Sequence, residues 1–157
     1  MNFIKKASSV LLILAIVIAH LTVNSSAQSS EVQFNKVGGY QTITKRDWAL
    51  IAKNPAKHKG KKISLFVHIY QFDSLTGDNQ FLGDVDVQNN LSSGYWSGGT
   101  TSLLVGTSSM LSDYVEDDVV KVNAVVLGTF SYTTKIGGTN NVPKLQIKSI
   151  KFIGSTS

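Results

Sequence analysis

Few side chains in this sequence are of the types that carry out catalysis. The chain has no cysteine, and of its three histidines only His58 and His68 lie beyond the apolar N-terminal stretch. Zinc sites and nucleophilic sites need several such groups at defined spacings, which two histidines do not supply. The Gly-x-Ser-x-Gly turn that exposes the nucleophile of many hydrolases is absent from the sequence. We therefore expect no enzymatic activity, no cofactor and no metal.

Oxygen-bearing side chains gather in residues 73–86 as Asp73, Asp78, Asn79, Asp84 and Asp86. Calcium prefers oxygen ligands, but the spacing lacks the alternate ligands and the terminal Glu of an EF-hand loop. Residues 73–79 contain Gly77 and have the composition of a β-hairpin turn. Two acids on one face of the next strand do not resemble the facing carboxylates of a glycoside hydrolase. We favour a plain hairpin and keep a calcium site as the alternative.

Two adjacent aromatic residues, Tyr95 and Trp96, lie in a segment rich in Gly, Ser and Asn (residues 89–99). Both cannot easily point inward, so we expect one ring to be exposed, where it can stack on a base or a sugar. The alternative is that Trp96 folds back over one end of the fold. Our candidate ligand-binding residues are these two together with Tyr70, Asp84, Asp86 and Thr134.

A basic patch precedes the first long strand and consists of Lys57, Lys59, Lys61 and Lys62. Such a run can bind an anion or an acidic surface. Charge runs are more often solvated faces, and we favour that interpretation here, with the lysines in a turn between a helix and a strand.

The N-terminal residues 1–27 have the layout of a secretory signal. Two lysines precede ten apolar residues (10–19), and Ser25, Ser26 and Ala27 form a small-residue cleavage site. The run is short for a membrane span, although an uncleaved anchor remains the alternative. Cleavage lowers the net charge from +5 to +3, because it removes two lysines and no acidic residue. We expect a secreted or extracytoplasmic protein, and the absence of cysteine favours a bacterial source.

Hydrophobic periodicity predicts the elements that position these residues. We expect a flexible lead-in (28–43), then a helix over 44–53 capped by Thr44, with Trp48 and Ile51 on its apolar face. Strands follow at 62–72, 81–88, 101–106, 119–134 and 144–153, with a short helix at 110–115 capped by Ser109. A second turn is predicted over 136–143. Gly128 and a change of apolar parity between Ile147 and Ile150 predict bends or bulges.

This order of elements predicts an all-β fold. Five strands with a helix between the third and fourth match the OB-fold, a small Greek-key barrel, in residues 44–157. A five-stranded SH3-like barrel or a small sandwich is the alternative. The intervening helix and the two long strands favour the OB arrangement.

Three motifs carry a family resemblance. They are Trp48-x-x-Ile51-x-Lys53-Asn54-Pro55-x-x-His58-x-Gly60-Lys61, then Gln71-Phe72-Asp73-x-x-Thr76-Gly77, then Gly128-x-x-x-Tyr132-x-Thr134-x-Ile136-Gly137-Gly138 with Pro143. Over residues 44–153 the chain resembles small exported bacterial proteins of Gram-positive type with an OB-like, anticodon-binding-like domain. The resemblance implies the fold and no particular activity. Relatives include lipoproteins, whereas this chain has no cysteine to carry a lipid.

The function we expect is that of a non-enzymatic, exported binding module that recognises a protein or a cell-surface glycan. The alternative is an oligonucleotide-binding OB protein that uses Lys57–Lys62 with Tyr95 and Trp96. OB-folds bind ligands on the outer face of their second and third strands, and here Asp84 and Asp86 on that face would repel phosphates. We therefore do not expect nucleic acid as the partner, and we expect membrane association only if the N-terminal segment stays uncleaved.

Overall fold

A computed structural model describes residues 39–133 and 137–156, which all belong to the compact unit Lys36–Ser157. The predicted signal segment and most of the predicted lead-in lie outside the described residues. Over the described ranges the structure is mostly strand, with few helices, which confirms the predicted β-rich class. None of the helices in these ranges is long and apolar enough to cross a membrane.

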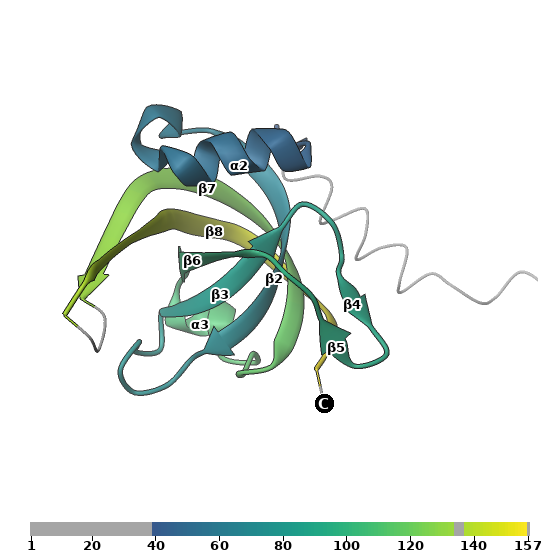
Figure 1. Cartoon of the computed structure of the whole chain (residues 1–157). Helices are drawn as coiled ribbons and strands as arrows, with labels where there is room; N and C mark the ends of the chain where they lie inside the picture. Colours follow the sequence, from purple (N-terminus) through teal and green to yellow (C-terminus); the bar gives the residue numbers. More distant parts are fainter. Residues whose placement is uncertain (1–38, 134–136, 157) are drawn as a thin grey trace, which may run out of the picture. The chain divides into compact units, whose positions relative to one another are not determined.

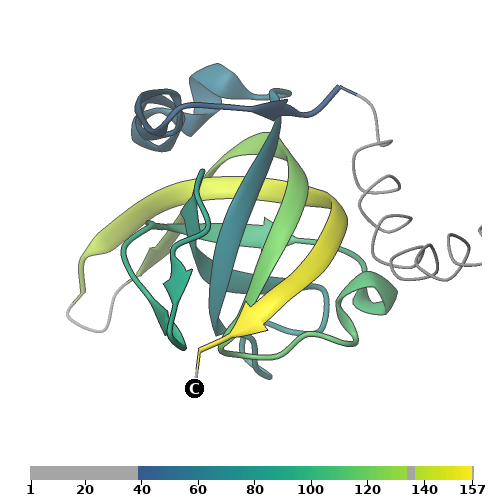
Figure 2. The same ribbon diagram turned by 90° about the vertical axis from the view of Figure 1, so that its right-hand side faces the viewer.

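Six strands form one sheet that closes on itself, because β2 pairs with both β3 and β7. The pairing order is β1-β2-β3-β6-β8-β7, and only the β1–β2 and β6–β8 pairs are parallel. Figures 1 and 2 show the long strands curving around a common interior. The strands are β1 (Gln41–Thr42), β2 (Lys62–Gln71), β3 (Gln80–Asp86), β6 (Thr100–Val105), β7 (Asp118–Thr133) and β8 (Thr139–Ser155).

Helix α2 (Lys45–Lys53) confirms the predicted N-terminal helix and its cap. The Thr44 side chain accepts a hydrogen bond from the backbone N–H of Asp47, whose carboxylate accepts one from the backbone of Thr44. The apolar face buries Trp48 and Ile51, and the indole N–H of Trp48 donates to the Val85 carbonyl at 3.2 Å. A short 3-10 helix, η1 (Pro55–His58), leads into β2.

Strand β2 shows the predicted alternation most clearly. Its four aliphatic residues are fully buried, while the residues between them are partly exposed. Side chains alternate across a strand, so one face of β2 builds the interior. The buried set is Ile63, Leu65, Val67 and Ile69. The same core contains Trp48 and Ile51 of α2, Phe81 and Val85 of β3, Leu104 of β6, Leu111 of α3 (Ser108–Leu111), the even-numbered residues 120–126 of β7, and Leu145 and Ile147 of β8.

Both predicted irregularities in the long strands are confirmed. The β7–β8 register shifts between Val126 and Gly128, where Gly128 adopts a φ of +128°, and again where Asn123 and Ala124 pair with Ser149 and Ile147. A left-handed φ favours glycine, which has no Cβ to clash.

Several predicted boundaries were wrong. The short helix α3 is Ser108–Leu111 rather than 110–115, and its cap is Thr107 rather than Ser109, because the Thr107 hydroxyl accepts from the Met110 N–H. Strand β8 begins at Thr139, so most of the turn expected over 136–143 is strand. Sequence patterns also missed three two-residue strands, namely β1, β4 (Leu91–Ser92) and β5 (Tyr95–Trp96), which are too short to show periodicity.

Among the described glycines, Gly83 leaves the least room for an added Cβ, so a substitution there should lower stability. A Cβ on Gly83 would lie 2.5 Å from Val67 Cγ1 and 2.8 Å from the His68 carbonyl oxygen. We expect Gly83→Ala to lower the free energy of unfolding by about 1–3 kcal/mol, because β2 or β3 must shift. Urea-induced unfolding measures this loss.

Gly154→Ala is the matched control. Its new Cβ would meet only the tip of a flexible side chain, Leu91 Cδ2, at 2.6 Å. We expect this variant to unfold close to the wild-type urea midpoint. Equal losses for the two variants would contradict a backbone clash at Gly83.

Candidate functional site

The outward-pointing residues of β3 and β6, together with Tyr70 of β2, form a surface that we call the outer face. Gly83 pairs with both Ile69 and Ser102, and all three belong to the inner side of the sheet. Their neighbours along the strands therefore point outward. We include in the outer face Tyr70, Leu82, Asp84, Thr101 and Leu103, of which the first four are partly exposed and Leu103 is only 3% exposed.

Three polar side chains lie together on the outer face. The Thr101 hydroxyl donates to Asp84 Oδ1 at 3.2 Å, and both side chains affect the pKa of Tyr70. Burial raises the pKa of Tyr70 above 10.0, the Thr101 side chain opposes this shift, and Tyr132 and Asp84 raise the pKa further. Tyr70 and Asp84, two predicted site residues, are thus brought together.

Two further aromatic residues reach this region from the β7–β8 hairpin. The Phe130 and Tyr132 rings stack with centroids 6.0 Å apart, and Asn140 Nδ2 donates to the Tyr132 hydroxyl at 3.2 Å. Both rings are half-buried and lie outside the core cluster. The bulge before Gly128 causes this change, since residues beyond it no longer face the interior. Tyr132 is also among the causes that raise the pKa of Tyr70, so the two side chains lie within electrostatic range of each other.

Sequence reasoning did not select Thr101, Phe130 or Tyr132 as site residues. The signal that could have identified the two aromatic residues was Gly128. The bend at Gly128 was predicted, but its effect on which side of the sheet the residues after it would take was not.

Asp86 has a different setting from Asp84. Its carboxylate accepts hydrogen bonds from the Gln88 backbone N–H and from Asn90 Nδ2, and it lies 3.9 Å from Lys45 Nζ. These contacts hold the segment after β3 and join it to α2. Asp86 therefore serves the local structure and is not directed toward the cluster around Tyr70.

The structure separates Tyr95 from Trp96. The hairpin of β4 and β5 leaves Tyr95 69% exposed and Trp96 only 6% exposed. The Trp96 ring stacks on His68 at a centroid distance of 6.2 Å, and its N–H donates to the Gly98 carbonyl. One ring of the two is exposed, as expected, and it is Tyr95, while Trp96 is buried against His68 of β2. His68 Nε2 lies 3.1 Å from Thr156 Oγ1, so the histidine joins two segments of the fold.

The remaining predicted residues lie elsewhere. Lys57, Lys59 and Lys62 are exposed and Lys61 is half-buried, all next to η1 at the start of β2. Lys62 Nζ lies 5.9 Å from the Tyr40 ring centroid. Thr134 is outside the described residues.

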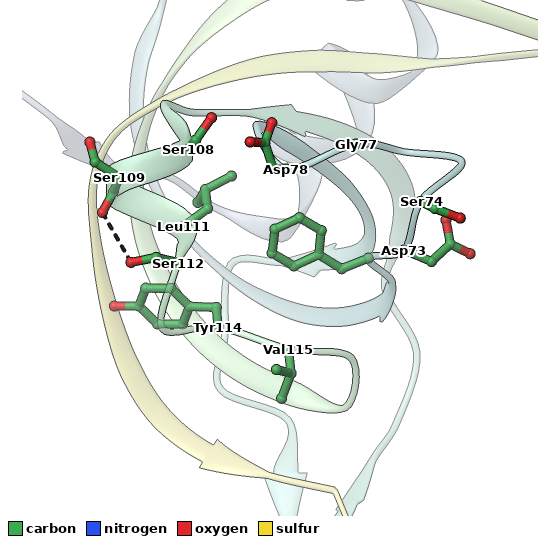
Figure 3. Close-up of a pocket in the computed structure, with 11 residues that line it drawn as sticks. Asp73, Ser74, Gly77, Asp78, Ser108, Ser109, Leu111, Ser112, Tyr114 and Val115 are labelled. Carbon is green, nitrogen blue, oxygen red and sulfur yellow. Dashed lines mark hydrogen bonds between the residues drawn. The ribbon is translucent and has the colours of Figure 1, made fainter.

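A cavity of about 660 Å³ lies between the 73–79 turn and α3 with the residues that follow it (Figure 3). None of our candidate ligand-binding residues lines it. Across residues 39–133 and 137–156, no group of three or more His, Asp or Glu side chains is arranged to hold a metal ion. The predicted turn is present, with Asp73 Oδ1 accepting from the Leu75 and Thr76 N–H groups.

Comparisons with known proteins identify no family. No family model matches the chain, and no curated protein matches it. Among solved structures, a crystal structure described as an aspartyl-tRNA synthetase from Leishmania major Friedlin aligns with a TM-score of 0.40 and 10% identity. That alignment covers 84% of this chain and 26% of the synthetase chain.

The Tyr70–Thr101–Asp84 cluster generates a pH prediction. We expect the Tyr70 hydroxyl to titrate above the ordinary tyrosine pKa of 10.0, as followed by NMR of labelled tyrosine ring carbons. Asp84→Asn removes a negative charge and lowers this pKa, whereas Thr101→Val removes the side chain that opposes the upward shift and raises it.

Asp86→Asn is the control, since Asp86 makes no contribution to the Tyr70 pKa and should leave the titration unchanged. A Tyr70 pKa that does not respond to Asp84→Asn would show that the cluster is not assembled in solution.

Proposed function

We propose that this chain is an exported, non-enzymatic binding module with an OB-type barrel, and that its outer face binds a cell-surface glycan. The observation that carries the proposal is the group of Tyr70, Thr101 and Asp84, in which Thr101 is hydrogen-bonded to Asp84, together with the stacked Phe130–Tyr132 pair. Export rests on the sequence of residues 1–27 alone.

The connectivity of the sheet supports an OB-type barrel. The main strands in chain order are β2, β3, β6, β7 and β8, and the sheet closes as β2-β3-β6-β8-β7-β2 with a single parallel pair inside the closed circuit, β6–β8. A helix, α3, lies between the third and fourth of these strands. OB-folds bind oligonucleotides and oligosaccharides on the face of their second and third strands, which correspond here to β3 and β6.

The chemistry of the outer face favours a sugar. A pyranose ring presents apolar C–H groups that pack on aromatic rings, and hydroxyl groups that need hydrogen-bond partners around them. Phe130 and Tyr132 supply the rings. The Tyr70 hydroxyl, the Thr101 hydroxyl, the Asp84 carboxylate and the Asn140 amide supply donors and acceptors.

The same face is less suited to a nucleic acid. Single-stranded nucleic acids are held by basic grooves with stacking aromatic residues. The carboxylate of Asp84 lies beside Tyr70, and the basic patch lies at the start of β2, whereas Tyr70 lies near its end. Phosphates along the outer face would meet a negative charge without help from those lysines.

Binding to purified cell-wall polysaccharide tests the proposal. We expect the purified chain to bind, as measured by co-sedimentation and calorimetry, and Tyr132→Ala to weaken binding about ten-fold, which corresponds to about 1.4 kcal/mol. Phe152→Ala is the matched control, because this aromatic residue is 52% exposed near the far end of β8 and is paired with Val120.

Other outcomes would indicate a different class of binding partner. Binding to single-stranded oligonucleotides that weakens steeply with salt would favour the nucleic-acid alternative. Failure to bind any polysaccharide, together with capture of an envelope protein that Tyr132→Ala abolishes, would assign the outer face to a protein partner.

A further inference from the structure

The two ends of the closed sheet carry opposite charge. Strand β2 runs ten residues from η1 to the 73–79 turn, which is roughly 33 Å. Seven of the chain's fifteen basic residues lie in residues 45–62, from α2 to the start of β2, and six of its ten acidic residues lie at the other end, in the 73–79 turn and residues 113–118. Figures 1 and 2 both place α2 above the closed sheet and α3 in its lower half.

The acidic end contains the cavity shown in Figure 3. Its apolar lining is Phe72, Leu111, Tyr114 and Val115, and Asp73 and Asp78 lie on its rim. No lysine or arginine is among the described residues that line it. Leu75 and Val115 are 86% and 62% exposed, which leaves apolar surface uncovered. Burial raises the pKa of Tyr114, and Asp113 and Asp118 raise it further, consistent with a negative environment.

The basic end presents a complementary surface on α2. Leu50 is 48% exposed, Arg46 lies four residues before it and Lys53 three residues after it. Residues three and four apart on a helix are neighbours, so these three side chains share one outward face. This face is an apolar side chain flanked by two cations, whereas the cavity is apolar with carboxylates at its rim.

We propose that the outward face of α2 of one molecule docks in the cavity between the 73–79 turn and α3 of a second copy. Leu50 contacts the apolar lining, while Arg46 and Lys53 approach Asp73, Asp78 and the acids that follow α3. The two surfaces lie at opposite ends of one molecule, so the contact forms only between molecules. It is a head-to-tail interface, which continues into a ring or an open chain of copies.

This contact is separate from the glycan-binding proposal. The outer face contributes none of its five residues to either surface, and a failure of sugar binding leaves the self-association measurement unaffected. Complementary charge makes the association dependent on salt, because exposed charges are screened within about 3 Å at about 1 M ionic strength.

Sedimentation velocity of the purified full chain tests the proposal. We expect concentration-dependent association at about 0.05 M salt that is lost at about 1 M salt. Arg46→Glu should weaken association at least about ten-fold, and combining it with Asp78→Lys should restore most of it, since the new pair is again of opposite charge. Lys148→Glu makes the same charge change at an exposed site on β8 and should have no effect.

Three results would overturn the proposal. One is a chain that stays monomeric at low salt and high concentration. Another is association that persists at high salt, which would indicate apolar aggregation through another segment. The third is equal weakening by Arg46→Glu and Lys148→Glu, which would reflect net charge alone. Thermal unfolding of each variant shows whether a loss of association arises from misfolding.

Discussion

The pairing of β2 with β7 is the contact on which the rest of the structure depends. It places β2 between two antiparallel neighbours and gives the sheet an interior instead of two open edges. Four aliphatic side chains of β2 then become fully buried. The other side of β2 then points outward, and the β2–β3 and β3–β6 pairs place Tyr70, Asp84 and Thr101 on neighbouring strands.

The elements with strong periodicity could be predicted from the sequence. Strand β2 alternates over ten residues, and α2 carries both a capping box and a two-residue apolar face, so local patterns determine them. The bulges near Gly128 and Ile147 could also be predicted, since each breaks the alternation of a long strand. The two-residue strands could not, because their pairing depends on where distant segments meet.

The candidate site was only partly accessible to sequence reasoning. Asp84 was placed on the outer face from strand parity, and parity does determine its side of the sheet. Tyr70 lies at a register shift in the β2–β3 pair, so parity alone does not determine its side. Trp96 was selected because it is adjacent to Tyr95, yet burial against His68 is a tertiary event that adjacency does not reveal. Tyr132 was not selected because its position outside the core depends on the bulge before Gly128 and on the pairing of β8 with both β7 and β6.

The bulge before Gly128 also divides the long β7–β8 hairpin into an inner part that packs in the core and an outer part that lies outside it. Before it, side chains of β7 must fit a packed interior, where even a methylene group matters. Beyond it, Phe130 and Tyr132 lie outside the core cluster and can be exchanged without repacking that interior. The outer half of the hairpin can therefore diverge in sequence faster than the inner half, because substitutions there leave the packed interior unchanged.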